Sequence, residues 1–576
     1  MGTGEVPGGA MDLTAIDNWD IGALDATESS LTARVDALTT VQADLASLAR
    51  LPGWDGEAAA TARGAYGMTQ DEVNREAVEL GAIRTLTQQT IDAVTHLKAQ
   101  LAGLRARASA DLMLIASDGS VVDASFAVLP TDPVALAARE AVKRELHDGA
   151  HALIMQAFDV DSDGAQVFSS IAAGTLQADG ATDLTSSLDA GSRLGELSAP
   201  YPPEGASPQQ IDAYWDALPE AQRAEMIAEH PTVIGNLDGI PSVARSEANI
   251  SRIPGDREHL QALEAQLRAE LDSNTFGGWA SNDDAGLTLV RNKLASLDAI
   301  DQALRDHPEA LLTVYDVSDH ERALAAVAIG NPDTADHVTV TTPGFDTTVH
   351  GSLTSMVSEA AVLNGEMRNQ LDLEGNVDDT VANVAWIGYE PPQSSNRPGL
   401  LDAVDGIGDV LSDDRATEAG GTLSSYYRGL DAASTVADPH ISAFGHSYGS
   451  LTTSEALQQG GSEVVDDAVF YGSPGLNAVA PSSMGMPYEH VWAIDADGDM
   501  VTTAGHFGPF ALFEAGPYNN NFQQLSSEAG ISAEGVLRDG SSGHSEYTRS
   551  GDNGMLRTSG YNLAVIGIGR PDLVMQ

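Results

Sequence analysis

The segment Gly445-His446-Ser447-Tyr448-Gly449 limits what this chain can fold into more than any other part of the sequence. It follows an apolar run, 441–444, and the residues after it, 450–459, have helical character. A serine on a sharp turn from a strand to a helix exposes its hydroxyl beyond the strand, and the flanking glycines allow that turn without a Cβ clash. The segment therefore predicts a nucleophile elbow with Ser447 at its tip; the alternative is an ordinary glycine-rich turn.

The region from residue 321 to the C-terminus alternates short apolar, β-branched runs with helical stretches. Strands separated by helices pair in parallel, so this region is predicted to be of the α/β class with a mostly parallel sheet. Catalytic groups of such sheets gather beyond the carboxyl ends of the strands, which is where Ser447 would lie. The expected strands are 324–329, 337–341, 383–389, 441–444, 468–471 and 491–494.

A serine hydroxyl becomes a good nucleophile when a histidine takes its proton, and the histidine needs an acid that fixes its tautomer. Where the serine stands on such an elbow, the acid follows it in the chain and the histidine comes last. The strand 491–494 runs into a turn with Asp495, Asp497 and Asp499. We expect Asp499 to be the acid because Gly498 lets it turn back across the strand ends, with Asp497 as the alternative. A solvated acidic turn or a cation site is the non-catalytic interpretation.

Two histidines, His506 and His544, follow Asp499. His506 comes soon after the acid and beside Phe507 and Phe510, so it is expected in a pocket wall. His544 lies in a Gly/Ser-rich loop with no apparent core role, and conspicuous polar residues on loops are more often functional than structural. His544 is therefore the predicted base, and a solvated loop histidine is the alternative.

The negative oxygen formed during acyl transfer needs two backbone N–H donors, of which the residue after the nucleophile, Tyr448, supplies one. The loop after the strand 337–341 contains Pro343-Gly344-Phe345, where Gly344 permits a close backbone approach. We expect the second donor there, from Gly344, Phe345 or Asp346; an ordinary Pro-Gly turn is the alternative. His446 is too constrained to reach the serine hydroxyl, so it is expected to flank this oxyanion hole or to pack under the elbow.

The composition is strongly acidic, with 84 Asp and Glu against 29 Lys and Arg and a formal net charge of −55. Such a surface repels phosphate backbones, which argues against nucleic-acid binding. It suits a secreted protein, a saline habitat or an organism whose whole proteome is acidic. The chain has no cysteine, which excludes disulfides, thiolate metal sites and a cysteine nucleophile. No metal or cofactor is expected.

We expect no targeting signal of the ordinary kinds in this sequence. Residues 1–10 have neither the basic nor the apolar region of an ordinary signal peptide. No window has the length of apolar run that a membrane span requires, so we expect no transmembrane segment. The expected location is the cytoplasm, or the outside of the cell by a route without a cleavable signal peptide.

Two long helices are predicted at the N-terminus. Apolar residues recur every three or four positions over 31–48 and again over 80–104, and the run Leu51-Pro52-Gly53-Trp54-Asp55-Gly56 separates them. Such helices should pack as an antiparallel hairpin. A β-hairpin with Asp118-Gly119 at its turn is expected over 112–122. The predicted domains are 1–125 for the helical hairpin, 126–320 for a mainly helical middle region and 321–576 for the catalytic domain.

The middle region contains a polar stretch, 159–192, that is expected to be a loop. Its pattern Asp159-x-Asp161-x-Asp163-Gly164 resembles the start of an EF-hand calcium loop. Ser170 stands where that loop requires a bidentate glutamate, so we expect an acidic turn and no calcium site.

The helical hairpin resembles the WxG-type hairpins exported by type VII secretion systems, through Trp54-Asp55-Gly56 at its turn. The resemblance implies a type VII secretion partner that contacts residues 20–110. The sequence departs from that pattern because Tyr66 has Gln70, and not an acid, four residues later. A tryptophan that only covers the end of a helical hairpin is the alternative.

A longer resemblance covers about residues 210 to 550. The run Ile329-Gly330-Asn331-Pro332-Asp333-Thr334-Ala335-Asp336-His337-Val338, leading into Pro343-Gly344-Phe345, resembles the start of an actinobacterial α/β-hydrolase family formerly named a domain of unknown function. The stretch from Tyr214-Trp215 to Ala248-Asn249 is similar to the helical lead-in of that family. The resemblance implies an α/β-hydrolase with Ser447, Asp499 and His544 as its triad, and it does not specify a substrate.

The expected function is hydrolysis of a carboxylic ester or related acyl bond of a small or lipid-like molecule. Aromatic residues in the segment 507–518 would form either an apolar wall for an acyl chain or ordinary packing. The alternatives are a serine peptidase, since the same triad cleaves amides, and a secreted interaction protein that carries the hydrolase domain as a passenger or degenerate scaffold.

Overall fold

A computed structural model describes residues 11–49, 53–124, 133–176, 181–198, 205–272, 286–318, 320–393, 413–507 and 516–576. The chain divides into two compact units. The first comprises Met1–Gly205 with Ala213–Arg223, and the second comprises Ala206–Asp212 with Ala224–Gln576. The predicted three-domain boundaries stay a prediction. Among the described helices, none combines the length and the apolar character needed to cross a membrane.

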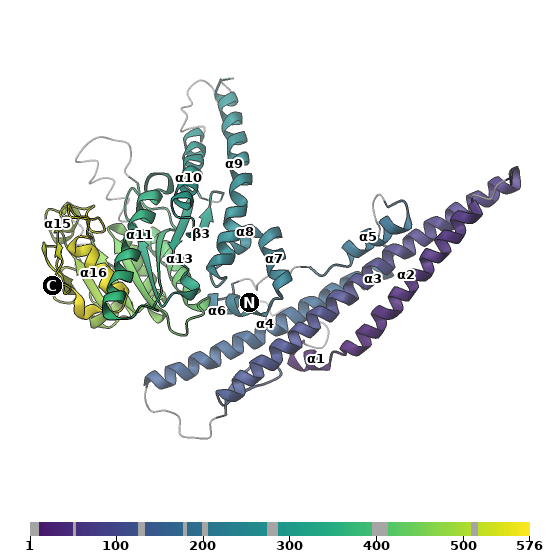
Figure 1. Cartoon of the computed structure of the whole chain (residues 1–576), viewed down its shortest axis with the longest axis horizontal. Coiled ribbons are helices and arrows are strands. Elements are labelled where there is room, and N and C mark those ends of the chain that lie inside the picture. The colour runs from purple at the N-terminus through teal and green to yellow at the C-terminus, as the bar shows by residue number, and fades with distance from the viewer. Residues whose placement is uncertain are drawn as a thin grey trace. The chain divides into compact units, whose positions relative to one another are not determined.

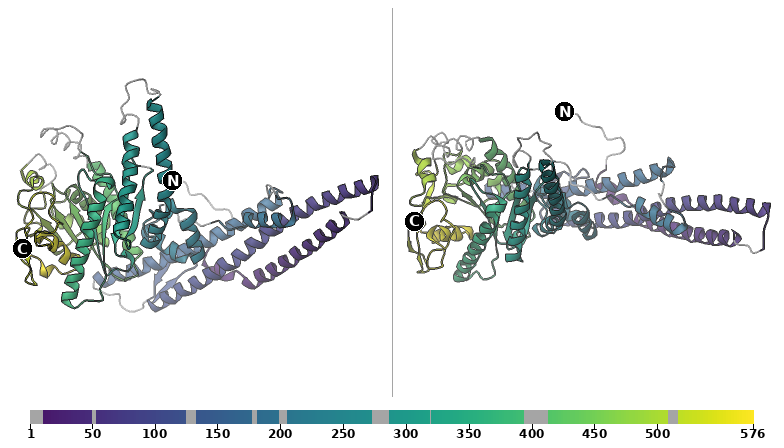
Figure 2. Two further views of the ribbon diagram at one scale, coloured as in Figure 1. Left: turned by 45° about the horizontal axis from the view of Figure 1, so that its top comes forward. Right: turned by 90° about the horizontal axis from the view of Figure 1, so that it is seen from above.

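Helices dominate the first unit. α1 covers Leu13–Asn18, α2 covers Ile21–Ala49 and α3 covers Glu57–Ala110. α2 lies along α3 in every view (Figures 1 and 2), and Leu38 packs there against Val73 and Leu80. The expected helical hairpin is therefore present. The two glycines of the break, Gly53 and Gly56, have positive φ angles of 78° and 111°, which other residues adopt only with strain.

The expected β-hairpin follows α3. β1, Met113–Ile115, pairs antiparallel with β2, Val121–Asp123. Gly119 at the turn has a φ of 82°, and the Asp118 carboxylate accepts the N–H of Ser120 at 3.0 Å. The Asp-Gly pair therefore forms the turn for the reason inferred from the sequence.

The prediction of a loop over 159–192 is wrong for 159–172 and for 184–192. α4 runs over Pro133–Ala172 and α5 over Leu184–Leu194, so all three aspartates of the EF-hand-like pattern lie in a helix. In the helix Asp159 and Asp163 lie one turn apart on the same face and Asp161 lies on another, so the acidic turn that we expected does not form. The sequence prediction gave too much weight to polar composition: Val167 is buried, and Ile171, one turn later, packs against the same apolar cluster.

Helices also lead into the sheet of the second unit. α9 and α10 lie side by side (Figures 1 and 2) and share an apolar cluster with Leu260, Leu297 and Ile300. The helices between α5 and the sheet are α6 Pro208–Ala217, α7 Glu220–Glu229, α8 Pro231–Ile234, α9 Ser242–Asp272 and α10 Leu287–Asp306.

An eight-stranded sheet forms the centre of the second unit, in the order β10-β9-β8-β7-β5-β6-β4-β3. All neighbours pair in parallel except β3 with β4 and β4 with β6. The prediction of a mostly parallel α/β sheet is therefore confirmed; β3 and β10 were not predicted. The strands are β3 Leu311–Asp316, β4 Leu324–Ile329, β5 His337–Thr342, β6 Val381–Ile387, β7 His440–His446, β8 Asp467–Tyr471, β9 Val491–Ile494 and β10 Gln523–Leu525.

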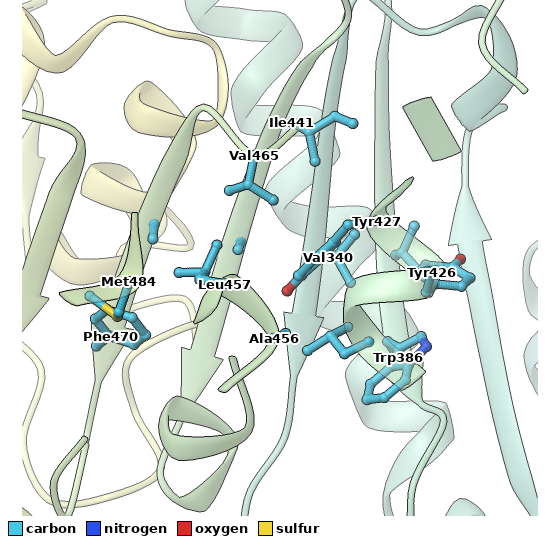
Figure 3. Close-up of a cluster of buried hydrophobic side chains, with 14 of the residues drawn as sticks. Val340, Trp386, Tyr426, Tyr427, Ile441, Ala456, Leu457, Val465, Phe470 and Met484 are labelled. Carbon is cyan, nitrogen blue, oxygen red and sulfur yellow. The ribbon is translucent and has the colours of Figure 1, made fainter. Parts of the chain in front are cut away.

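Helices cover both faces of this sheet (Figure 1). α13, Asp413–Ala432, and α14, Tyr448–Gln458, lie on one face, and their side chains join Val340, Trp386 and Phe470 in a buried cluster (Figure 3). α11, Val349–Glu374, and α16, Thr558–Gly567, cover the other face. The central parallel strands are consequently buried on both sides, and their carboxyl ends meet at one edge.

Shorter elements are α15 Met500–Phe507, β11 Gly530–Ile531 and β12 Leu537–Arg538.

Candidate active site

Ser447 lies on the turn between β7 and α14, as the sequence predicts. Its φ and ψ angles are 56° and −128°, a conformation that is strained for any residue with a Cβ atom. A hydrogen bond from its N–H to the Tyr471 carbonyl, 3.0 Å long, helps to hold the turn. The serine itself is 5% exposed, so only a small part of it reaches the surface.

The glycines that flank Ser447 are required by close backbone approaches. A Cβ atom on Gly445 would lie 2.7 Å from Ser450 Cα, and one on Gly449 would lie 2.2 Å from the Thr342 carbonyl oxygen. Both distances are shorter than van der Waals contact. The glycines therefore allow α14 to start against β7 and against the end of β5.

Asp499 and His544 meet at the same edge of the sheet. Nδ1 of His544 lies 3.1 Å from Oδ1 and 3.0 Å from Oδ2 of Asp499. The carboxylate is buried, with the residue 1% exposed, and it also accepts the Val501 N–H at 2.8 Å and the Tyr547 hydroxyl at 2.7 Å. Burial by itself raises the pKa of Asp499, but these hydrogen bonds outweigh burial and lower that pKa below its usual value.

Asp497, the alternative acid, has a different position. Asp497 is exposed, and its backbone carbonyl accepts the Gly543 N–H at 2.9 Å. Asp497 thus helps to hold the loop of His544 through its main chain, and it is Asp499 whose carboxylate meets the imidazole.

His446 connects the elbow to the loop of His544. Its ring lies 4.8 Å from the His544 ring and 5.0 Å from the Tyr471 ring, measured between centroids. Nε2 of His446 lies 3.0 Å from the His544 carbonyl oxygen; because a carbonyl only accepts, this nitrogen carries the proton. Burial, and then the nearby His544, lower the pKa of His446 to about 4. His446 therefore packs against the His544 ring as a neutral imidazole.

The lowered pKa of the half-buried His446 predicts a loss of stability in acid. The unfolded chain takes up a proton near pH 6.5 and the folded chain only near pH 4, so the free energy of unfolding falls as pH drops through this window. The contribution of His446 is about 3 kcal/mol. The free energy of unfolding of the wild type and of His446→Gln should be measured by urea unfolding at several pH values. Between pH 7 and pH 4.5 it should fall more steeply for the wild type than for the variant. Parallel curves would contradict this role.

The predicted oxyanion loop lies directly against the elbow. A Cβ atom on Gly344 would be 2.4 Å from Ser447 Cβ and 2.8 Å from Tyr448 N, so only glycine fits there. Tyr448 is the first residue of α14, and the N–H groups of the first turn of a helix favour a negative charge. The Asp346 N–H already donates to the Pro392 carbonyl at 2.9 Å. The remaining candidate oxyanion donors of this loop are therefore the N–H groups of Gly344 and Phe345.

Three residues of this site were missed in the sequence. Gly472, with a φ of 60°, follows β8, and a Cβ atom there would lie 3.2 Å from Cε1 of His544. Tyr547 donates to Asp499 while its oxygen accepts the Ala496 N–H at 3.0 Å. Tyr471 supplies the carbonyl that holds Ser447. The available signals were that Gly472 follows a predicted strand and that Tyr547 comes three residues after His544.

Other predicted site features have less support. The side chains of His506, Phe507, Phe510 and Phe513 lie outside the described residues. Tyr518 is described, and its hydroxyl oxygen accepts the Ser473 N–H at 2.6 Å. Within the described parts of the chain, no three His, Asp or Glu side chains are grouped so that they would hold a metal ion.

A mostly parallel sheet with a serine on the turn after a central strand, followed by an acid after a later strand and a histidine on a later loop, is typical of the α/β-hydrolase class. A family model described as alpha/beta hydrolase matches residues 319–509. An uncharacterized protein of Mycobacterium tuberculosis is 38% identical over 266 residues, which cover 46% of this chain and 94% of that protein. The chain therefore belongs to this alpha/beta hydrolase family.

Two more distant similarities were also found. A second uncharacterized protein of Mycobacterium tuberculosis is 28% identical over 319 residues, covering 54% of this chain and 46% of that protein. The apo form of Thermogutta terrifontis esterase 2 covers 46% of this chain and 96% of its own, with 14% identity and a TM-score of 0.26. A likeness as low as this carries no argument about activity.

Proposed function

We propose that this chain is a serine hydrolase that cleaves a carboxylic ester or a related acyl bond. The observation that carries the proposal is the contact of His544 Nδ1 with the buried Asp499 carboxylate at 3.0 Å, beside the strained turn of Ser447. Membership of the alpha/beta hydrolase family supports hydrolysis in general. The triad and the ester substrate are our inference from the geometry.

In the first half-reaction, Ser447 Oγ forms a bond to the substrate carbonyl carbon, and Nε2 of His544 takes the hydroxyl proton. Asp499, through Nδ1, stabilises the imidazolium that results. The N–H groups of Tyr448 and of Gly344 or Phe345 stabilise the negative oxygen. When the tetrahedral intermediate collapses, the bond to the alcohol breaks and His544 returns its proton to that alcohol.

In the second half-reaction, water replaces the alcohol. His544 takes a proton from the water, the hydroxyl adds to the acyl carbon, and the bond to Ser447 Oγ breaks as the serine regains a proton. The products are a carboxylic acid and the free enzyme. This sequence of steps requires no cofactor.

Matched substrates test the proposal. The purified full chain should hydrolyse p-nitrophenyl esters of short and medium acids, with an initial burst of p-nitrophenol that matches the enzyme concentration. The p-nitroanilides of the same acids should react much more slowly. Equal turnover of anilides and esters would favour the peptidase alternative, and no turnover of either above buffer would favour a degenerate hydrolase scaffold.

A further inference from the structure

The oxyanion loop, 342–348, is fastened to a second segment that no sequence motif indicates. This segment, 389–393, follows β6, and we name it the brace. The Tyr389 hydroxyl donates to the Pro343 carbonyl at 2.6 Å, the Asp346 N–H donates to the Pro392 carbonyl at 2.9 Å, and Gln393 Nε2 donates to the Thr347 carbonyl at 3.2 Å. The brace therefore contacts the loop on both sides of Gly344.

The bond from Tyr389 acts on the peptide group that contains a candidate oxyanion donor. The Pro343 carbonyl and the Gly344 N–H belong to one planar peptide and point in opposite directions. Fixing the carbonyl therefore fixes the direction of the N–H. The carbonyl oxygen also lies close to Gly449, since a Cβ atom on Gly449 would be 2.6 Å from it.

Tyr389 is itself held rigidly. It is 6% exposed, and its ring stacks on the fully buried Trp386 with 5.8 Å between centroids and 15° between planes. Burial raises the pKa of Tyr389, so the hydroxyl stays protonated and able to donate. Figure 3 shows Trp386 in the cluster between the sheet and α13. The core thus determines where this hydroxyl lies.

We propose that Tyr389, assisted by Gln393, is a positioning residue that holds the oxyanion loop in the geometry required by the transition state. This proposal rests on the proposed function, because it assumes that the Gly344 region receives the negative oxygen. A donor that is already aimed at the developing charge avoids reorganisation during the reaction. Loss of the brace should therefore affect the chemical step more than substrate binding.

The test compares Tyr389→Phe with Tyr426→Phe. Tyr426 is a matched control because it is buried in the same cluster, its ring lies 6.2 Å from Trp386, and its hydroxyl bonds to Thr313 Oγ1 at 2.7 Å. Each variant removes one hydrogen-bonded buried hydroxyl and keeps the ring. Tyr426 has no bond to the oxyanion loop among those that the structure describes.

Two readouts separate positioning from general stability. For p-nitrophenyl ester hydrolysis, Tyr389→Phe should lower kcat by about 10-fold with KM within about twofold, and Tyr426→Phe should leave both within about twofold. Phenylboronic acid forms a bond from Ser447 Oγ to boron, with the serine proton passing to His544 and the negative charge on the boronate. Its inhibition constant should rise by about 10-fold in Tyr389→Phe alone.

The outcomes distinguish the two proposals. If the wild type is active and Tyr389→Phe behaves as Tyr426→Phe in both readouts, the brace proposal is wrong and the proposed function stands. A wild type that neither hydrolyses esters nor binds phenylboronic acid would overturn both. If Tyr389→Phe does not fold, the Gln393→Ala variant decides. It should lower kcat by a smaller factor than Tyr389→Phe and leave KM unchanged. An unchanged kcat in that variant would overturn the proposal.

Discussion

The Ser447→Ala variant is expected to lose ester hydrolysis by roughly 10⁵- to 10⁶-fold in kcat, the scale seen when a triad nucleophile is removed. The substitution deletes the oxygen that forms the acyl-enzyme. Alanine has the same Cβ atom as serine, so the backbone at a φ of 56° is under the same strain and the fold should be retained. Steady-state hydrolysis of a p-nitrophenyl ester, with circular dichroism as the check on folding, measures the effect.

A matched control for this variant is Ser454→Ala. Ser454 is a fully buried serine of α14, the helix that begins directly after Ser447, and alanine is a good helix former. Its kcat should remain within about threefold of the wild type, allowing for repacking. Substantial turnover by Ser447→Ala would show that another group is the nucleophile.

The Asp499→Asn variant is expected to lower kcat by about 10³- to 10⁴-fold, as the same change does in a serine protease. Val501 donates to Oδ1 and Tyr547 to Oδ2, so the amide loses one of these bonds in either orientation. It also loses the charge that stabilises the imidazolium, and its NH₂ group favours the wrong tautomer of His544. The measurement is kcat against pH for a p-nitrophenyl ester.

Asp497→Asn is the control for this second prediction. It removes an exposed carboxylate of the same turn and keeps the backbone bond from Gly543 to the carbonyl of residue 497. We expect kcat within about twofold of the wild type, since an exposed charge contributes little. The opposite pattern, with Asp497→Asn inactive and Asp499→Asn active, would assign the acid to Asp497.

The sequence was sufficient for the central part of the fold. Buried strands are rich in apolar or β-branched residues, which made β4, β5 and β7 recognisable, and the glycines around Ser447 marked the elbow. The short edge strand β10, only Gln523–Leu525, has no such run. The stretch 159–192 was misjudged because helical spacing of a few apolar residues determined the structure, in spite of the polar composition.

The site could be predicted only where chain order limits the choice. The order of serine, acid and histidine led to Asp499 and His544, which the structure brings together. Gly472, Tyr547 and Tyr389 contact segments far from them in the chain. The weak signals at Gly472 and Tyr547 do not show which residues they meet, and no local pattern marks Tyr389. The type VII secretion partner for residues 20–110 and the location of the protein stay predictions.

The most direct test of the account is to treat the full chain with a fluorophosphonate and to map the adduct by peptide mass spectrometry. The phosphorus forms a bond to an activated serine oxygen and loses fluoride, so labelling requires both the nucleophile and its base. We predict one adduct per chain, on Ser447, lost in Ser447→Ala and strongly reduced in His544→Ala. An unlabelled wild type, or an adduct that persists in Ser447→Ala, would contradict the assignment of Ser447 as the nucleophile.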